Sequence, residues 1–193
     1  MQETWLIAGL GNPGPRYETT RHNIGQMALD VLATDLNAKY ATHKSNCRIA
    51  EARLRPGGPK VVLAKPNSYM NLSGGPVLNA MKYFDIPSER LIVLHDELDI
   101  PFDTIRLKTG GGHGGHNGLR DIAKSLGTPD FLRVRIGIGR PPGSQDVADF
   151  VLSPFSSTER KTLEVLVSEA AEAATQIIDN GLVAAQQRYH ARG

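Results

Sequence analysis

Short apolar runs separated by turn residues dominate the first hundred positions of the chain. Trp5–Leu10 and Leu91–Leu94 are continuously apolar, which is typical of strands covered on both faces. Cys47–Leu54 alternates loosely and is followed by a Pro/Gly-rich turn and then by the apolar run Lys60–Ala64. This arrangement predicts two neighbouring strands joined by a turn.

Two later segments alternate apolar and basic residues. Ile105–Lys108 and Leu132–Ile138 both have the period of two that predicts a strand. In the second segment we expect Arg133 and Arg135 to face outward. The side chains expected to face the core are Leu132, Val134 and Ile136.

Several segments between these predicted strands have the periodicity of helices. Apolar residues from Ile24 to Leu36 recur three and four positions apart, which predicts an amphipathic helix. Shorter helices are predicted from about Pro76 to Phe84, with the proline in the first turn, and over Leu119–Leu126. A short helix is also expected within 146–152.

The last long helix has clear end signals. Ser156 and Glu159 form a capping-box pattern at its start, and Asn180-Gly181 ends it. Strands that alternate with helices predict an α/β fold: a single three-layer domain with a mixed central β-sheet flanked by helices.

Composition narrows the class of protein without identifying it. The chain has 193 residues, 40% of them apolar and 22% charged, so it is long enough for one domain and is not a disordered or coiled-coil sequence. No apolar run approaches the roughly 18 residues of a membrane span, and no signal-peptide pattern precedes Trp5. We therefore expect a cytoplasmic protein without a membrane partner, in which the single Cys47 is a spectator.

Charge is distributed unevenly along the chain. Thr104–Arg140 holds seven basic and two acidic residues, a balance of +5, whereas the part from Pro141 onward holds four basic and seven acidic residues, a balance of −3. A basic segment of this kind indicates a phosphate-bearing partner, including nucleic acid.

The basic segment contains an unusual loop, Thr109–Gly118. Its ten residues include six glycines together with His113, His116 and Asn117. Glycine is entropically costly, so a chain uses it where the backbone takes positive φ or closely approaches another molecule. The loop lies between a strand and a helix, which favours ligand contact through backbone N–H groups.

Polar residues also stand at the ends of other predicted elements. Asn12, His22 and Asn71 follow or precede regular segments, and the pair His95-Asp96 follows a buried strand. If these positions converge, the pocket holds a histidine beside a carboxylate and several neutral amides. A carboxylate fixes the tautomer of a histidine base, and amides donate to a developing oxyanion, so the combination predicts a hydrolase.

Other chemistries are less well supported by the spacing. His113-x-x-His116 lies in a glycine loop, and there is no HExxH or paired CxxC, so we predict no metal site. There is no GxSxG elbow, no Walker motif and no GxGxxG followed by a ribose-binding acid. Taken singly, Asn12 and Asn71 could be turn formers and His22 a helix cap.

Several ordered motifs together resemble the bacterial peptidyl-tRNA hydrolase family. They are Gly9–Gly14 with Tyr17, Thr20–Asn23, Tyr69–Gly74, His95–Asp99, Gly110–Gly118 and Arg133–Gly139. The resemblance implies a monomeric cytoplasmic enzyme that cleaves the ester between a peptide and the 3′-terminal ribose of tRNA, releasing tRNA from chains abandoned by the ribosome. It also implies a phosphorylase/hydrolase-like fold, and no metal or other cofactor.

The resemblance also implies roles for individual residues. His22 is similar to the general base and Asp96 to the group that orients it. Lys108 and Arg135 resemble a basic pair that contacts the 5′-phosphate of tRNA, and 141–152 resembles a mobile flap. The residues implied to bind substrate are Asn12, Tyr17, Met70, Asn71, Gly114, Gly115 and Asn117.

Two other functions remain open at this point. One is a non-catalytic RNA-binding protein on the same scaffold, since some organellar members of the family act in splicing. The other is an amidase or esterase that acts on small peptides without RNA.

Overall fold

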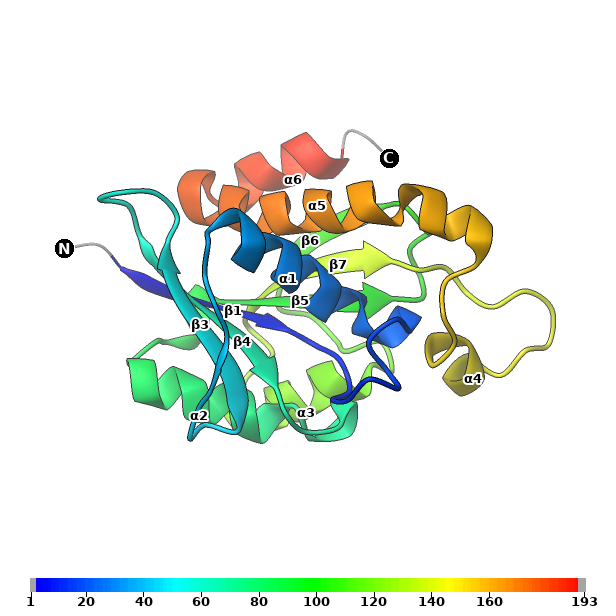
Figure 1. Ribbon diagram of the computed structural model, residues 1–193, viewed down its shortest axis with the longest axis horizontal. Helices are drawn as coiled ribbons and strands as arrows, with labels where there is room; N and C mark the ends of the chain where they lie inside the picture. Colours follow the sequence, from blue (N-terminus) through cyan, green and yellow to red (C-terminus); the bar gives the residue numbers. More distant parts are fainter. Residues whose placement is uncertain (1–2, 191–193) are drawn as a thin grey trace.

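Seven strands form one sheet in the order β2-β3-β4-β1-β5-β7-β6 in the computed structural model, which describes residues 3–190 (Figure 1). Their bounds are β1 Thr4–Gly9, β2 Ala41–Thr42, β3 Cys47–Arg53, β4 Lys60–Pro66, β5 Leu91–Glu97, β6 Ile105–Thr109 and β7 Leu132–Gly137. The neighbours β4, β1, β5 and β7 run parallel, whereas β3 pairs antiparallel with β4 and β6 antiparallel with β7. The predicted mixed sheet is confirmed.

Helices cover both faces of this sheet, as predicted. The longer ones are α1 Ile24–Asp35, α2 Gly74–Phe84, α3 Asn117–Leu126, α5 Ser157–Asn180 and α6 Leu182–His190; α4 Val147–Val151 and the 3₁₀ turns η1 Arg21–Asn23, η2 Met70–Leu72 and η3 Ser88–Arg90 are short. α1, α5 and α6 lie on one side of the sheet and α2 and α3 on the other, while α4 stands beyond the carboxyl ends of β5 and β7 (Figure 1). No helix within residues 3–190 has the length and apolar composition that a membrane span needs.

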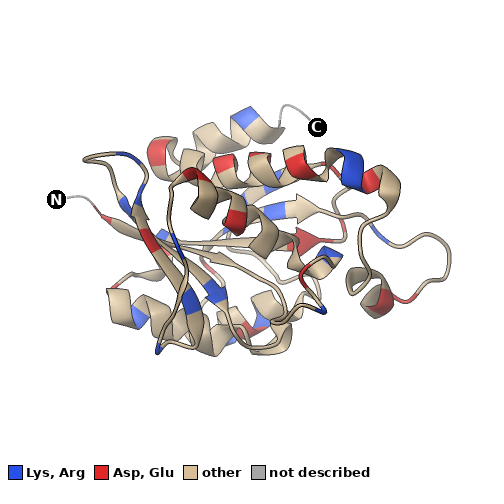
Figure 2. Cartoon of the chain, in the orientation of Figure 1, with Lys and Arg blue, Asp and Glu red and all other residues tan. Residues whose placement is uncertain are grey.

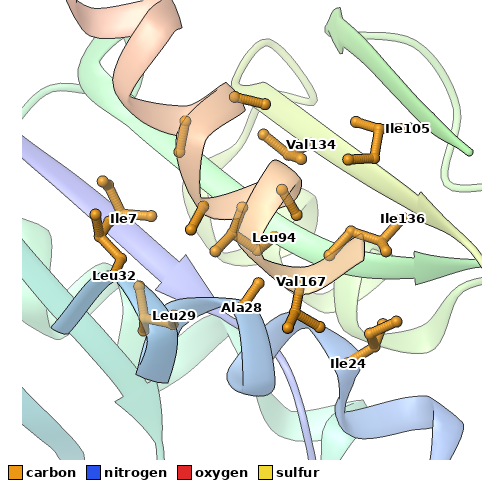
Figure 3. Close-up of a cluster of buried hydrophobic side chains, with 14 of the residues drawn as sticks. Ile7, Ile24, Ala28, Leu29, Leu32, Leu94, Ile105, Val134, Ile136 and Val167 are labelled. Atoms are coloured by element: carbon orange, nitrogen blue, oxygen red, sulfur yellow. The ribbon is translucent and has the colours of Figure 1, made fainter. Parts of the chain in front are cut away.

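Successive side chains of a buried strand point to opposite faces of the sheet, and both faces are covered by helices. This explains why the strand sequences are continuously apolar. On β1, Ile7 packs into the cluster beneath α1 and α5, whereas Leu6 and Ala8 pack into the cluster beneath α2 and α3. The first cluster also contains Leu94 of β5 and Val134 of β7, which meet side chains of α1 and α5 (Figure 3). Both faces are covered, so no polar position interrupts the run.

The end signals of α5 are confirmed. The Ser156 hydroxyl accepts from the Glu159 N–H at 3.1 Å, and the Glu159 carboxylate accepts from the Ser156 N–H at 2.8 Å. Gly181 ends the helix with φ +86°. Acidic residues outnumber basic ones on α5, whereas β7 carries basic ones (Figure 2), in keeping with the charge division along the sequence.

Helix α6 follows Gly181 directly and was not predicted. It packs on β6, the edge strand of the sheet, where the Leu107 N–H donates to Nε2 of His190 at 2.9 Å. Nε2 of Gln186 donates to the Leu107 carbonyl at 3.0 Å. Side chains of α6 therefore occupy backbone groups of an otherwise unpaired strand edge.

The prediction that Arg133 faces outward is wrong. Its side chain is 1% exposed, because the glycine loop and the turn before β7 fold over it. The guanidinium donates to the carbonyls of Gly112 at 2.7 Å, Gly111 at 3.1 Å and Pro129 at 2.9 Å. Arg135, two residues on, is only half-buried, and the expected inward positions Val134 and Ile136 are fully buried.

Candidate active site

Loops at the carboxyl ends of β1, β4 and β5 meet the glycine loop and α4 around a cavity of about 540 Å³, which we call the central cavity. Most of the predicted site residues line it: Asn12, His22, Met70, Asn71, Asp96, Gly114, Gly115 and Asn117. The expected convergence of distant element ends is therefore observed. An apolar part of its wall comes from α4, through Val147 and Val151, and Glu97 and His116 also line it.

A buried carboxylate joins two imidazoles at the floor of the central cavity. Asp96, 3% exposed, lies 2.8 Å from Nδ1 of His22 through one oxygen and 2.8 Å from Nε2 of His116 through the other. Nδ1 of His116 accepts the backbone N–H groups of Gly118 and Leu119, so its Nε2 carries the proton that is donated to Asp96. The His116 ring is thus held as a neutral donor.

The charge of Asp96 sets the protonation of His22. Burial by itself lowers the pKa of His22, but the neighbouring carboxylate and its hydrogen bond raise it above the ordinary 6.5. Burial favours the protonated acid at Asp96, yet His22 and His116 hold the pKa of that carboxyl well below its usual range. With Nδ1–H donated to an ionised Asp96, Nε2 of neutral His22 remains available to take a proton.

His95 packs behind Asp96 and His116, on the side away from the cavity. It is fully buried, its Nδ1 lies 2.7 Å from the Asp96 carbonyl, and its ring centroid is 5.1 Å from that of His116. Burial is the largest cause that lowers the pKa of His95 to about 3, so the ring stays neutral. A fully buried, neutral imidazole packs the back of the site and does not reach the cavity.

Neutral amides surround His22. The Oδ1 atom of Asn12 accepts the Met70 N–H at 2.7 Å, which leaves its NH₂ group as the free donor. Asn23 fixes the Asn12 backbone through hydrogen bonds of 2.9 Å to both its N–H and its carbonyl. Asn71 and Asn117 are exposed, and their side-chain amides make no hydrogen bond within residues 3–190. These three amides can donate to an oxyanion without adding charge.

Of three further residues expected to bind substrate, Gly114, Gly115 and Tyr17, two line the central cavity. Gly114 and Gly115 line the cavity with φ of +58° and +83°, a backbone conformation that explains glycine there. Tyr17, expected at the wall, does not line the cavity; its ring packs edge-on against Tyr69, which does, with centroids 6.2 Å apart. Tyr17 therefore supports the wall from behind.

A second hollow of about 320 Å³, the basic hollow, adjoins the central cavity. Lys108, Arg133 and Arg135 line it, and Glu97 and Gly114 line both hollows. Partial burial, followed by the charges of Arg135 and Arg133, lowers the pKa of Lys108. An anion bound here would relieve this repulsion, which suits a phosphate.

Sequence reasoning missed Arg21, which precedes His22. Its buried side chain donates to the Phe150 carbonyl at 3.2 Å, to the Ser153 hydroxyl, and to the Glu159 carboxylate at 2.8 Å. The guanidinium also lies 4.0 Å from the Phe150 ring centroid. Arg21 therefore ties α4 and the start of α5 to the turn that carries His22. No local pattern could have revealed this, because its partners lie more than a hundred positions away.

Within residues 3–190, the one group of three side chains that could hold a metal ion is His22, Asp96 and His116, in which Asp96 is hydrogen-bonded to both histidines. One donor atom from each of His22, Asp96 and His116 lies within 4.8 Å of the others. Nδ1 of His22 and Nε2 of His116 are already hydrogen-bonded to the Asp96 carboxylate, and backbone N–H groups fix the tautomer of His116. Binding a metal here would break both hydrogen bonds to Asp96.

Replacing Arg133 by methionine should destabilise the protein and disturb the glycine loop. The substitution leaves three carbonyls without the charged donor that satisfies them, so we expect a loss of about 1.5–3 kcal/mol in unfolding free energy. Denaturant unfolding measures this loss. Arg135→Met on the same strand is the control, because the Arg135 guanidinium makes no hydrogen bond within the described chain. Equal losses in both variants would contradict the anchoring role.

Comparison with known proteins gives a consistent result. A family model described as peptidyl-tRNA hydrolase matches residues 6–193. The chain is 57% identical to the peptidyl-tRNA hydrolase of Leifsonia xyli subsp. xyli over the full length of both, and 57% identical to that of Arthrobacter sp. over 98% of each. Among solved structures it is similar to peptidyl-tRNA hydrolase from Acinetobacter baumannii, with a TM-score of 0.89, 37% identity, and coverage of 98% of this chain and 95% of that one. An Arabidopsis thaliana 5′-methylthioadenosine nucleosidase, at 8% identity, 94% and 97% coverage and a TM-score of 0.54, shares the fold alone.

Proposed function

This chain belongs to the peptidyl-tRNA hydrolase family, and we propose that it hydrolyses the ester between a peptide and the 3′-terminal ribose of tRNA by general-base catalysis. The observation that supports this mechanism best is the hydrogen bond between His22 and Asp96 in a cavity walled by neutral amides. Its product would be free tRNA, recovered from chains that the ribosome has abandoned.

His22 acts on water in the proposed reaction. Asp96 holds Nδ1–H, so Nε2 accepts a proton from a water molecule as its oxygen attacks the ester carbonyl. The resulting imidazolium is stabilised by the Asp96 charge and then protonates the departing ribose oxygen. The products are a tRNA hydroxyl group and a peptide carboxylic acid, which releases its proton to solvent and becomes a carboxylate.

Amide donors are proposed to stabilise the tetrahedral intermediate. Asn71 and Asn117 have free NH₂ groups at the cavity wall, and Asn12 has one free NH₂ group because its oxygen is occupied by Met70. Such donors act without reorganisation at the moment of reaction, and losing one costs on the order of 3 kcal/mol in the barrier.

A covalent route through a serine or cysteine finds no support in the cavity. The Ser73 hydroxyl is fully buried and donates to the Met70 carbonyl, and the Ser68 hydroxyl donates to the Leu72 carbonyl. Cys47 lies in the core beneath α2 and α3, where burial raises its thiol pKa to about 11. Water is therefore the proposed nucleophile.

One assay separates this function from its rivals. We expect hydrolysis of N-acetyl-aminoacyl-tRNA at a much higher kcat/KM than hydrolysis of the matching acyl-nucleoside ester. Equal rates on both would indicate an esterase without an RNA requirement, and tRNA binding without hydrolysis would indicate an RNA-binding protein. We further propose, as the motif resemblance implies, that the enzyme is a cytoplasmic monomer that needs no metal, so added chelator should not change the rate.

The basic hollow is proposed to bind a tRNA phosphate through Lys108 and Arg135. Lys108→Ala and Arg135→Ala should each raise KM and reduce the slope of log KM against log salt by about one, because each phosphate contact releases counterions. Lys161→Ala on the exposed side of α5 is the control and should change neither quantity. An unchanged salt slope in both hollow variants would remove the proposed phosphate contact.

A further inference from the structure

Helix α4 contributes one wall of the central cavity, although it stands apart from the sheet (Figure 1). The lining residues from this helix and its C-terminal end, which we call the α4 wall, are Val147, Ala148, Val151 and Leu152. Residues 142–149 are all exposed. A helix of five residues is too short to be stable by itself, so contacts with other segments must hold the α4 wall in place.

Hydrogen bonds from Arg21 supply this support. Nη1 of Arg21 donates to the Phe150 carbonyl at 3.2 Å and to the Ser153 hydroxyl, and the Arg21 N–H donates to the Ser153 carbonyl at 3.1 Å. Among residues 3–190, the hydrogen bonds that join α4 and Ser153 to other segments all come from Arg21. The guanidinium also lies 4.0 Å from the Phe150 ring centroid. We call this set of contacts the Arg21 tether.

Glu159 fixes the other side of the guanidinium from the first turn of α5. Its Oε1 atom accepts Nη2 of Arg21 at 2.8 Å and also the Ser156 N–H at 2.8 Å. The Arg21 side chain is 9% exposed and that of Glu159 18%, so salt screens this ion pair less than it screens a surface pair. A buried charge is costly unless it is paired, so the guanidinium stays between the Glu159 carboxylate and the α4 carbonyl.

Arg21 and His22 are adjacent in η1, but their side chains have different partners. Asp96 of β5 holds His22 through a hydrogen bond of 2.8 Å, whereas the Arg21 side chain contacts α4 and the start of α5. Removing the Arg21 side chain therefore releases the α4 wall and leaves the partner of His22 in place. The mechanism proposed above does not use Arg21.

We propose that Arg21 is a positioning residue that holds the α4 wall at the central cavity and thereby increases the affinity for substrate. Its kinetic readout rests on the proposed function. An apolar wall contacts the bound substrate equally before and during the reaction, so its loss raises KM and leaves kcat unchanged. The planar guanidinium reaches three acceptors at once, for which a lysine ammonium has no matching geometry.

Hydrogen exchange followed by mass spectrometry measures the Arg21 tether without any substrate. In Arg21→Met the amides of 147–153 should exchange at least about tenfold faster than in wild type, because the charged hydrogen bonds to this segment are lost. The increase in α1 should be smaller. With N-acetyl-aminoacyl-tRNA, KM should rise about tenfold, while kcat stays within about twofold of wild type and the acid limb of the pH profile does not move.

A second variant tests the pair from the side of α5. Glu159→Gln keeps the capping box, because a glutamine oxygen also accepts the Ser156 N–H, but it removes the charge that faces Arg21. Exchange of 147–153 and KM should both rise, by less than in Arg21→Met. The double variant should exchange no faster than Arg21→Met, because the two residues act through one contact. Glu159→Gln also decides the proposal if Arg21→Met does not fold.

Arg55→Met is the matched control, because Arg55 also pairs with an α5 carboxylate, that of Asp179, at the other end of the helix. It should match wild type in the exchange of 147–153 and in KM. Wild-type exchange of 147–153 in Arg21→Met, an equal increase throughout the chain, or a fall in kcat with a shifted acid limb would overturn the positioning role. A wild-type enzyme inactive on the substrate would overturn the proposed function instead, and hydrogen exchange would still decide the Arg21 tether.

Discussion

Replacing His22 by alanine is expected to lower kcat for N-acetyl-aminoacyl-tRNA by about 10²–10⁴, the usual contribution of a general base. Binding of tRNA should change little, because the proposed phosphate contacts lie in the basic hollow and not at His22. Single-turnover hydrolysis gives the chemical rate, and a filter-binding titration gives the dissociation constant.

A second variant tests whether the loss of kcat in His22→Ala comes from damage to the fold. His22→Asn retains an NH₂ donor for Asp96 but has no basic nitrogen, so it should fold and bind normally and still lose turnover. His43→Ala is the matched control, because His43 packs against Tyr83 and Phe84 and lines neither the central cavity nor the basic hollow. If turnover and tRNA affinity fell equally in both His22 variants, His22 would be structural.

Replacing Asp96 by asparagine should lower kcat by up to about 10⁴ and move the acid limb of the pH profile to lower pH. An amide offers one oxygen and one NH₂, so either His22 or His116 loses its acceptor and the tautomer of His22 is no longer fixed. In the wild type, Asp96 raises the pKa of His22 above 6.5, and activity should increase with pH through that raised value. Without the carboxylate charge, burial alone lowers the pKa of His22.

The measurement is log kcat/KM against pH for wild type and Asp96→Asn at constant ionic strength. Asp179→Asn, the same change at a carboxylate paired with Arg55 on the surface, should leave both the rate and the acid limb unchanged. An acid limb that stayed in place in Asp96→Asn would show that a group other than His22 titrates, and would contradict the proposed base.

Local rules were sufficient for most of the elements. Periodicity identified the strands and helices, because the number of buried faces of an element determines the spacing of its apolar residues. The capping box at Ser156 and the stop at Gly181 were read correctly, since both depend on residues within one turn. The element after Gly181 was missed because α6 is stabilised by packing on β6 and by Gln186 and His190 at the strand edge.

The candidate site was predictable to the extent that it consists of element ends. The carboxyl ends of parallel strands share one edge of a sheet, so Asn12, Asn71 and Asp96 were expected to meet there. Assigning the pair His22 and Asp96 depended on the resemblance, because the two residues are 74 positions apart and no periodicity connects them. The structure brings their side chains to 2.8 Å.

The amino-acid order alone therefore determined the α/β layers, the mixed sheet and the edge at which the polar residues gather, because each depends on short-range pattern. Only the tertiary structure decided that Arg133 turns inward to hold the glycine loop, that His116 shares Asp96 with His22, and that Arg21 fastens α4 beside the base. The physical reason is the same in each case. A buried charge goes where carbonyls and carboxylates from distant segments can satisfy it, and that position exists only after those segments have packed together.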